Sequence, residues 1–155
     1  DAGIGKRLMA HVRQQIRDAI VTALTGLTTT GSNVFRSRIY PLESTKLPGL
    51  CIFTRSEAVE FDTLTISRSI SRVLDVSVEA YVSATANYDN TLDTIAVEVE
   101  EALAADVTLG SKSKDLQVTA FEVDFSGDGE QPVAVGRFTV SVQYRTAEND
   151  VETAA

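Results

Sequence analysis

The sequence predicts an α+β fold in which two helices lie on a mainly antiparallel sheet. Two segments carry apolar residues at spacings of three and four, the pattern of amphipathic helices. Several other segments alternate apolar and polar residues, the pattern of half-buried strands. The expected order is helix, two short strands, one long strand, helix and two further strands. A length of 155 residues is consistent with one domain.

The first predicted helix covers residues 6–27 and ends at a Gly- and Thr-rich loop. Its only histidine, His11, is expected at the surface, because no acidic or Cys residue lies three or four positions away. The second helix is predicted after Asn90, which can cap its N-terminus. The expected buried stripes are Leu8, Val12, Ile16, Ile20, Ala23, Leu24 and Leu27 in the first helix, and Leu92, Ile95, Ala96, Val99, Ala102 and Leu103 in the second.

Two short strands are predicted at residues 34–40 and 50–53, separated by a Pro-Gly turn. The second is a continuous apolar run, which is typical of a strand covered on both faces. Its Cys51 is therefore expected to be a small buried residue rather than a nucleophile.

Residues 64–83 alternate so regularly that they predict one long strand. Eight of the ten even positions are apolar, and no Gly, Pro or Asn marks a turn. At ~3.3 Å per residue such a strand spans about 60 Å, whereas a domain of this size is about 40 Å across. We therefore predict that residues 57–72 form an arm beyond the subunit body. A strongly curved strand inside one domain is the alternative.

Two closing strands are predicted at 116–125 and 132–144, joined by a hairpin connection at 126–130. In each strand the apolar residues change from one parity to the other along the segment. A parity change indicates a β-bulge or a bend, and Gly136 stands where the second change occurs.

Composition excludes several classes of function. One Cys and one His exclude a disulfide framework, a cysteine-rich zinc site and a histidine cluster. The carboxylates of the second helix lie off its apolar stripe and are expected to be solvated. No apolar stretch approaches the ~18 to 20 residues that span a bilayer. No catalytic residue, metal or cofactor is therefore expected, and the protein is not expected to be an enzyme or a membrane protein.

Charge is distributed unevenly along the chain. Residues 1–50 carry 7 Lys/Arg and 3 Asp/Glu, whereas residues 51–155 carry 7 Lys/Arg and 19 Asp/Glu. Unlike patches of this kind suit head-to-tail association of identical subunits. The domain is expected to span residues 9–146. Residues 1–8 are expected to be an expression remnant or a flexible N-terminal extension, and the polar residues 147–155 a flexible tail.

Seven segments in this order resemble the tail terminator proteins of long-tailed bacteriophages, the lambda-like minor tail protein U group. The resemblance covers about residues 10–146, and it lies in the ordered set rather than in one motif. The segments are the helix His11 to Leu27, Val34-Phe35 with Arg38, the Pro-led strand 48–53, the acidic segment 57–62, the strand end 76–80, Leu92-Asp93 opening the second helix, and the final strand 138–144.

The resemblance implies a structural function in a virion. Such proteins form a hexameric ring at the head-proximal end of the tail, assembled in the host cytoplasm. The ring caps the tail tube, terminates its polymerisation and offers the surface to which the head docks. The implied partners are identical copies, the tail tube protein and a head-completion or connector protein. DNA passes through the lumen without specific binding, and acidic residues there would prevent adhesion to phosphates.

An interface between subunits, or with the tube, is expected to join basic residues of one copy to acidic residues of another. The candidate residues are Arg36, Arg38, Glu57, Glu60, Asp62, Leu64, Ile66, Arg68, Ile70 and Arg72. Two alternatives stay open at this point. The chain could be a tail tube or head–tail joining protein, or a small α+β ligand-binding module or enzyme.

Overall fold

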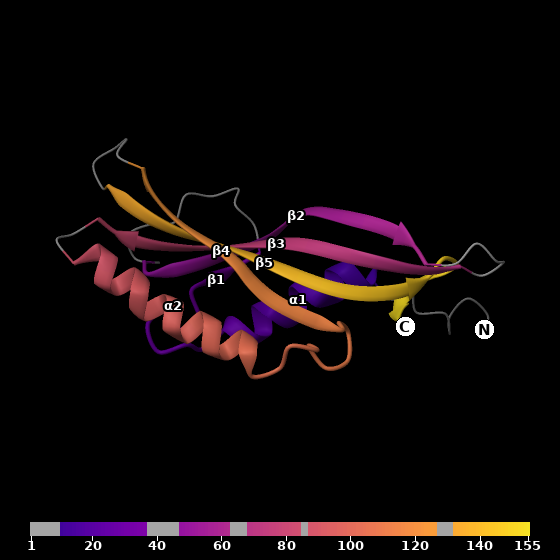
Figure 1. Ribbon diagram of the computed structural model, residues 1–155. Coiled ribbons are helices and arrows are strands. Elements are labelled where there is room, and N and C mark those ends of the chain that lie inside the picture. The colour runs from indigo at the N-terminus through magenta and orange to yellow at the C-terminus, as the bar shows by residue number, and fades with distance from the viewer. Residues whose placement is uncertain (1–9, 37–46, 63–67, 85–86, 127–131) are drawn as a thin grey trace.

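The computed structural model describes residues 10–36, 47–62, 68–84, 87–126 and 132–155. Figure 1 shows an elongated molecule in which two helices lie against a long twisted sheet. The predicted α+β class and the mainly antiparallel sheet are confirmed. The elements are α1 Val12–Leu24, β1 Val34–Phe35, β2 Gly49–Phe61, β3 Ser69–Ser83, α2 Tyr88–Ala104, β4 Asp115–Ser126, β5 Val133–Ala147 and β6 Asp150–Ala154.

The strands lie in the order β1-β2-β3-β5-β4, and β6 pairs with the end of β5. The short β1 runs parallel to β2, whereas the other pairs are antiparallel. At the centre, Val78 of β3 stands between Ile52 of β2 and Phe138 of β5. All three are fully buried, so the core lies between the middle of the sheet and the two helices.

The helices are close to their predicted positions, but their ends differ. Helix α1 begins at Val12, because His11 is its N-cap and its Nδ1 accepts a hydrogen bond from the amide of Arg13 at 3.0 Å. His11 is thus a capping residue rather than an ordinary surface residue. Helix α2 begins at Tyr88 with Asn87 at the N-cap, and Asn90 lies in its first turn.

The predicted long strand is wrong. Phe61 of β2 pairs with Ile70 of β3 in an antiparallel register, so the chain reverses between them. Residues 57–61 of the acidic segment belong to β2. Residues 57–72 therefore contribute the end of a two-stranded hairpin instead of a single-stranded arm. Leu64 and Ile66 lie outside the described residues.

Of the two predicted bulges, the structure contains one. The register of β4 against β5 shifts between Val118 and Ala120, where the parity changes. No shift occurs at Gly136, whose register with β3 and β4 is continuous. A Cβ atom there would stand 2.9 Å from Phe121 Cε1 and 3.1 Å from Leu92 Cδ2. Glycine is needed because these side chains pack onto the backbone.

The sheet has one face that bears the helices and one that does not. The even residues of β3 from Ile70 to Val82 face the helices and are buried. Directly paired residues share a face. On the other face, the part of the sheet nearest the β2–β3 hairpin carries three rows of mainly small and polar side chains. These rows are Ser56-Asp75-Ser141-Gln117, Ala58-Val73-Gln143-Asp115 and Glu60-Ser71-Arg145.

The C-terminus differs from the expected flexible tail. Strand β5 continues to Ala147, and β6 folds back to pair with it. The carbonyl of Glu152 accepts a hydrogen bond from Gln15 Nε2 at 2.8 Å, which ties β6 to α1. Residues 1–8 lie outside the described residues.

Candidate functional site

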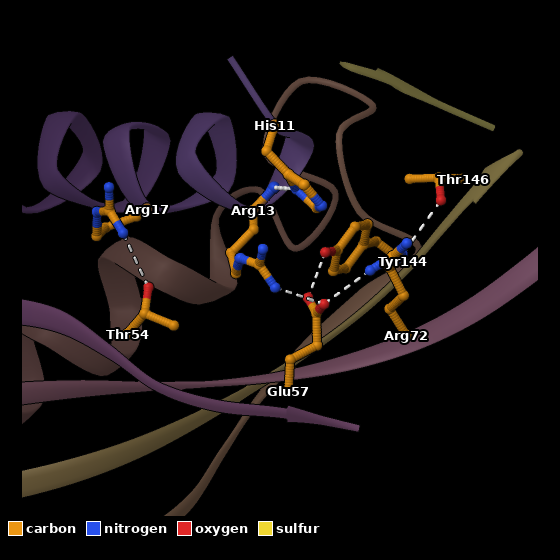
Figure 2. A network of polar contacts seen from close by, with 8 residues as sticks. All are labelled: His11, Arg13, Arg17, Thr54, Glu57, Arg72, Tyr144 and Thr146. Atoms are coloured by element: carbon orange, nitrogen blue, oxygen red, sulfur yellow. Dashed lines mark hydrogen bonds and ion pairs between the residues drawn. The ribbon is translucent and has the colours of Figure 1, made fainter. Parts of the chain in front are cut away.

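A cluster of charged and polar side chains surrounds Glu57, in the second half of β2, between the sheet and the start of α1 (Figure 2). A β-bulge between Thr54 and Ser56 sets the register in which Glu57 pairs with Leu74. Because Leu74 faces the helices, so does Glu57. The bulge therefore brings an acidic side chain against α1.

Both carboxylate oxygens of Glu57 are used. Oε2 accepts hydrogen bonds from Nη1 of Arg13 at 2.8 Å and from Nη1 of Arg72 at 2.9 Å. Oε1 accepts a hydrogen bond from the hydroxyl of Tyr144. Arg72 Nε also donates to Thr146 Oγ1 at 3.1 Å. The cluster thus joins α1, β2, β3 and β5.

Burial gives these contacts their energetic weight. The side chains of Glu57 and Arg72 are only 5% and 9% exposed, whereas that of Arg13 is 37% exposed. Burial, together with the hydrogen bond to the Glu57 carboxylate, raises the pKa of Tyr144 well above its usual value. Burial and the neighbouring Arg13 and Arg72 lower the pKa of His11. Tyr144 therefore keeps its proton and donates a hydrogen bond to Glu57, and His11 is neutral, so that its Nδ1 accepts the capping hydrogen bond.

This arrangement fastens α1 to strands β2, β3 and β5. One oxygen of Glu57 is shared between two guanidinium groups, and the other accepts a hydrogen bond from the hydroxyl of Tyr144.

A second buried carboxylate, Glu79, lies on the helix-free face. Its side chain is fully buried, and Oε2 accepts a hydrogen bond from Arg137 Nε at 2.7 Å. Its Oε1 accepts one from the hydroxyl of Tyr81 at 2.8 Å. Arg137 is also 3.9 Å from Glu122. The hydrogen bond to Glu79 raises the pKa of the Arg137 guanidinium.

The ten predicted interface residues divide into three groups. Glu57, Ile70 and Arg72 are buried within the chain. Arg36, Glu60, Asp62 and Arg68 are described and at least partly exposed. Arg38, Leu64 and Ile66 lie outside the described residues.

The exposed charged residues also have partners within their own chain. Arg36 pairs with Asp18. Arg68 lies 3.6 Å from Glu148, and its guanidinium carbon is 5.3 Å from the centre of the Phe61 ring. Asp62 pairs with Arg145 at 3.3 Å. Surface pairs of this kind are weak, so these side chains can exchange partners.

Sequence reasoning singled out Glu57 and Arg72 but not their contact with each other. It missed Arg13 and Tyr144, which complete the cluster, and Glu79 and Arg137, which form the second pair. One signal was available. Arg72 interrupts the apolar parity of its strand, and a charge on a buried face requires a partner of opposite charge.

Exposed apolar side chains gather at the two sides of the sheet. On β4 they are Phe121, Val123 and Phe125, which are 39%, 48% and 56% exposed. On β2 they are Val59 and Phe61, each 48% exposed. All five lie on the helix-bearing face, since their partners in the register do.

A groove of about 550 Å³ lies between α1, α2 and the segment 106–112. Its lining includes Ala19, Ala23 and Ala102, and its polar rim includes Asp106. That carboxylate accepts hydrogen bonds from Thr108 and Gly110, which lower the pKa of Asp106. Among the described residues, no group of three or more His, Cys, Asp or Glu could hold a metal ion. Within the same parts of the chain, no helix is long and apolar enough to cross a membrane.

Comparisons with known proteins give distant structural similarity and no match at the level of family or curated sequence. No protein-family model matches the chain. No significant match is found among curated proteins. Among solved structures, the chain is similar to one from a structure described as the virion of a native gene transfer agent particle. The identity is 17%, the match covers 92% of this chain and 99% of that chain, and the TM-score is 0.35. A TM-score of this size records a distant likeness and assigns no function.

Proposed function

We propose that this protein is a structural component of a virion that forms a ring on the tail of a long-tailed phage. The ring caps the tail tube, ends its polymerisation and offers the docking surface for the head. The observation that carries the proposal is the one-sided sheet with exposed apolar residues on both flanking strands. Exposed apolar patches of this kind suit contacts between proteins. The ordered resemblance of the sequence to tail terminators adds the ring and its place.

Contacts between copies would use the exposed charged residues. Arg36, Glu60 and Arg68 are accessible, and the ion pairs that Arg36 and Arg68 make within the chain are weak surface contacts. Glu57 and Arg72 are better explained as residues that stabilise the subunit itself. Six copies, a tail tube protein and a head-completion protein remain the proposed partners.

The helix-free face is suited to the lumen. The three rows near the β2–β3 hairpin hold Ser, Gln, Ala and Val73 together with Glu60, Asp75 and Asp115, with Arg145 as their basic member. Arg137, farther along the same face, is paired with the buried Glu79. Such a surface offers few cations for binding phosphate, so DNA could slide past it without adhesion. The helices would then lie on the outside of the ring. Catalysis has no place in this function.

Negative-stain microscopy of the purified full chain tests the proposal. Rings of one diameter are expected. Tubes of variable length would favour a tail tube protein. Monomers at all concentrations would overturn the ring and favour a ligand-binding module. Because charged contacts at the rim are screened by salt, the fraction of rings is expected to fall between about 0.05 M and 1 M NaCl.

A further inference from the structure

The sheet has two open edges. Strand β4 is the last in the order, so no strand among the described residues pairs with its outer side. On the other flank, β1 pairs only with Leu50 and Cys51. The outer side of β2 from Thr54 to Phe61 therefore has no strand beside it in the described parts of the chain. Open edges pair readily with other strands unless they are blocked.

We infer that β4 of one copy adds to the open side of β2 of the next, so that one sheet continues around the ring. This inference rests on the proposed ring and names the surfaces that close it. The occupant of the β4 edge is thus a second copy of this chain.

Strand direction permits this contact. Three successive antiparallel pairings separate β2 from β4, so the two edge strands run in opposite directions. A rotation about an axis along the strands preserves their directions. It therefore places β4 of one copy antiparallel to β2 of the next, as a hydrogen-bonded ladder requires.

The side chains also match by face. Phe121, Val123 and Phe125 on β4, and Val59 and Phe61 on β2, all lie on the helix-bearing face. The two apolar clusters stand at opposite ends of the sheet, about nine residues apart along the strands. Bringing them together staggers neighbouring copies by roughly 30 Å. The strands would then be inclined to the ring axis, as they are in closed barrels.

Charge argues against the alternative in which β4 pairs with β4 of a twofold-related copy. Antiparallel pairing about Val123 would set Glu122 directly opposite Asp124 of the other copy, twice over. Both side chains are exposed acids, and like charges opposite each other destabilise a strand pair. Pairing Val123 with Val59 of β2 leaves one such like-charge pair in each contact, Glu122 opposite Glu60, instead of two. It also keeps a free edge at each end, as ring closure needs.

The test uses three variants of the full chain that each add one charge at an exposed valine. Val123→Lys blocks the β4 edge, and Val59→Lys blocks the β2 edge. Val97→Lys is the matched control, because Val97 is 55% exposed and belongs to α2 rather than to either edge strand. Sedimentation velocity is expected to show loss of rings for the first two variants and parent-like rings for the third. Circular dichroism checks that all three remain folded.

Mixing distinguishes this contact from the others. Val123→Lys keeps an intact β2 edge, and Val59→Lys keeps an intact β4 edge. An equimolar mixture is therefore expected to form dimers with one good contact, although neither variant alone associates. Parent-like rings from Val123→Lys would overturn the inference while leaving the ring proposal in place. Parent-like rings from Val59→Lys would show that the β2 edge is not part of the contact and would likewise overturn the inference. A parent protein that stays monomeric would overturn both proposals.

Discussion

Two buried carboxylates, Glu57 and Glu79, lie on opposite faces of one sheet and are held in different ways. Glu57 is bound by Arg13, Arg72 and Tyr144, which come from a helix and two strands. Glu79 is bound by Arg137 on the adjacent strand and by Tyr81 on its own strand. The backbone ladder already joins the strands around Glu79, whereas the contacts of Glu57 connect α1 to the sheet. Glu57 therefore holds a helix against the sheet, whereas Glu79 only pairs with charged and polar groups of its own and the neighbouring strand.

The largest expected effect comes from Glu57→Gln, which keeps the shape of the side chain but removes its charge. Arg72 would remain only 9% exposed without its anion. Breaking a buried pair in this way costs about 3–5 kcal/mol. Urea unfolding should show the loss as a lower free energy of unfolding. The control, Glu60→Gln, changes an exposed residue of the same strand and is expected to stay within about 0.5 kcal/mol of the parent.

The same substitution at the second carboxylate is expected to cost less. Glu79→Gln leaves Arg137 25% exposed and still near Glu122, so water can solvate the guanidinium. The expected loss is about 1–3 kcal/mol, the cost of weakening a buried hydrogen bond to a charged group. A loss equal to or larger than that of Glu57→Gln would show that the two sites do not differ as described.

The smallest effect appears only at high pH. Because the pKa of Tyr144 is raised in the folded state, the unfolded chain releases this proton first, at about pH 10. The folded state then binds more protons, so stability is present below pH 10 and declines above it. Tyr144→Phe should remove part of that decline. Tyr88→Phe, at a partly buried tyrosine on α2, is the control and should keep the parent's decline. Unfolding in urea at pH 8, 10 and 11 provides the measurement.

The helices and their buried faces could be predicted because the spacing of apolar residues within each segment is enough to identify them. Val12, Ile16, Ile20 and Leu24 recur on one face of α1, and all four are fully buried. The stripe of α2 is likewise buried or partly buried. Cys51 is buried as predicted. Helical spacing records which side meets the core, and no long-range knowledge is needed.

The β2–β3 hairpin could not be predicted by the same means. The residues from 62 to 68 include no Gly, Pro or Asn, and their apolar positions continue the parity of β3. The alternation of apolar and polar residues therefore continues across the place where the chain reverses, and it does not mark the turn. The second half of β2 could not be predicted from its residues either, because a run of acidic residues is typical of a solvated loop. Within that run, Val59 and Phe61 do alternate with polar residues and lie on the helix-bearing face together with Glu57.

The partners of Glu57 depend on register and on the packing of α1. Arg13 is 44 residues away from Glu57, and Tyr144 is 87 residues away. The bulge between Thr54 and Ser56 decides which face Glu57 occupies. A parity argument that omits the bulge places it on the opposite face. Long-range contacts of this kind are settled only by the folded chain.

The central pairing of β3 with β5 also has a consequence for how the chain folds. The β2–β3 and β4–β5 hairpins are local, whereas β3 and β5 join residues 50 to 78 positions apart. Isolated hairpins close in about 1–10 μs. Joining them requires closure of a long loop that contains α2, and sheets dominated by such distant pairings fold in about milliseconds to seconds. The slow step is therefore expected to be the docking of two preformed hairpins along β3 and β5. Helix α2 lies in the segment that connects the two hairpins.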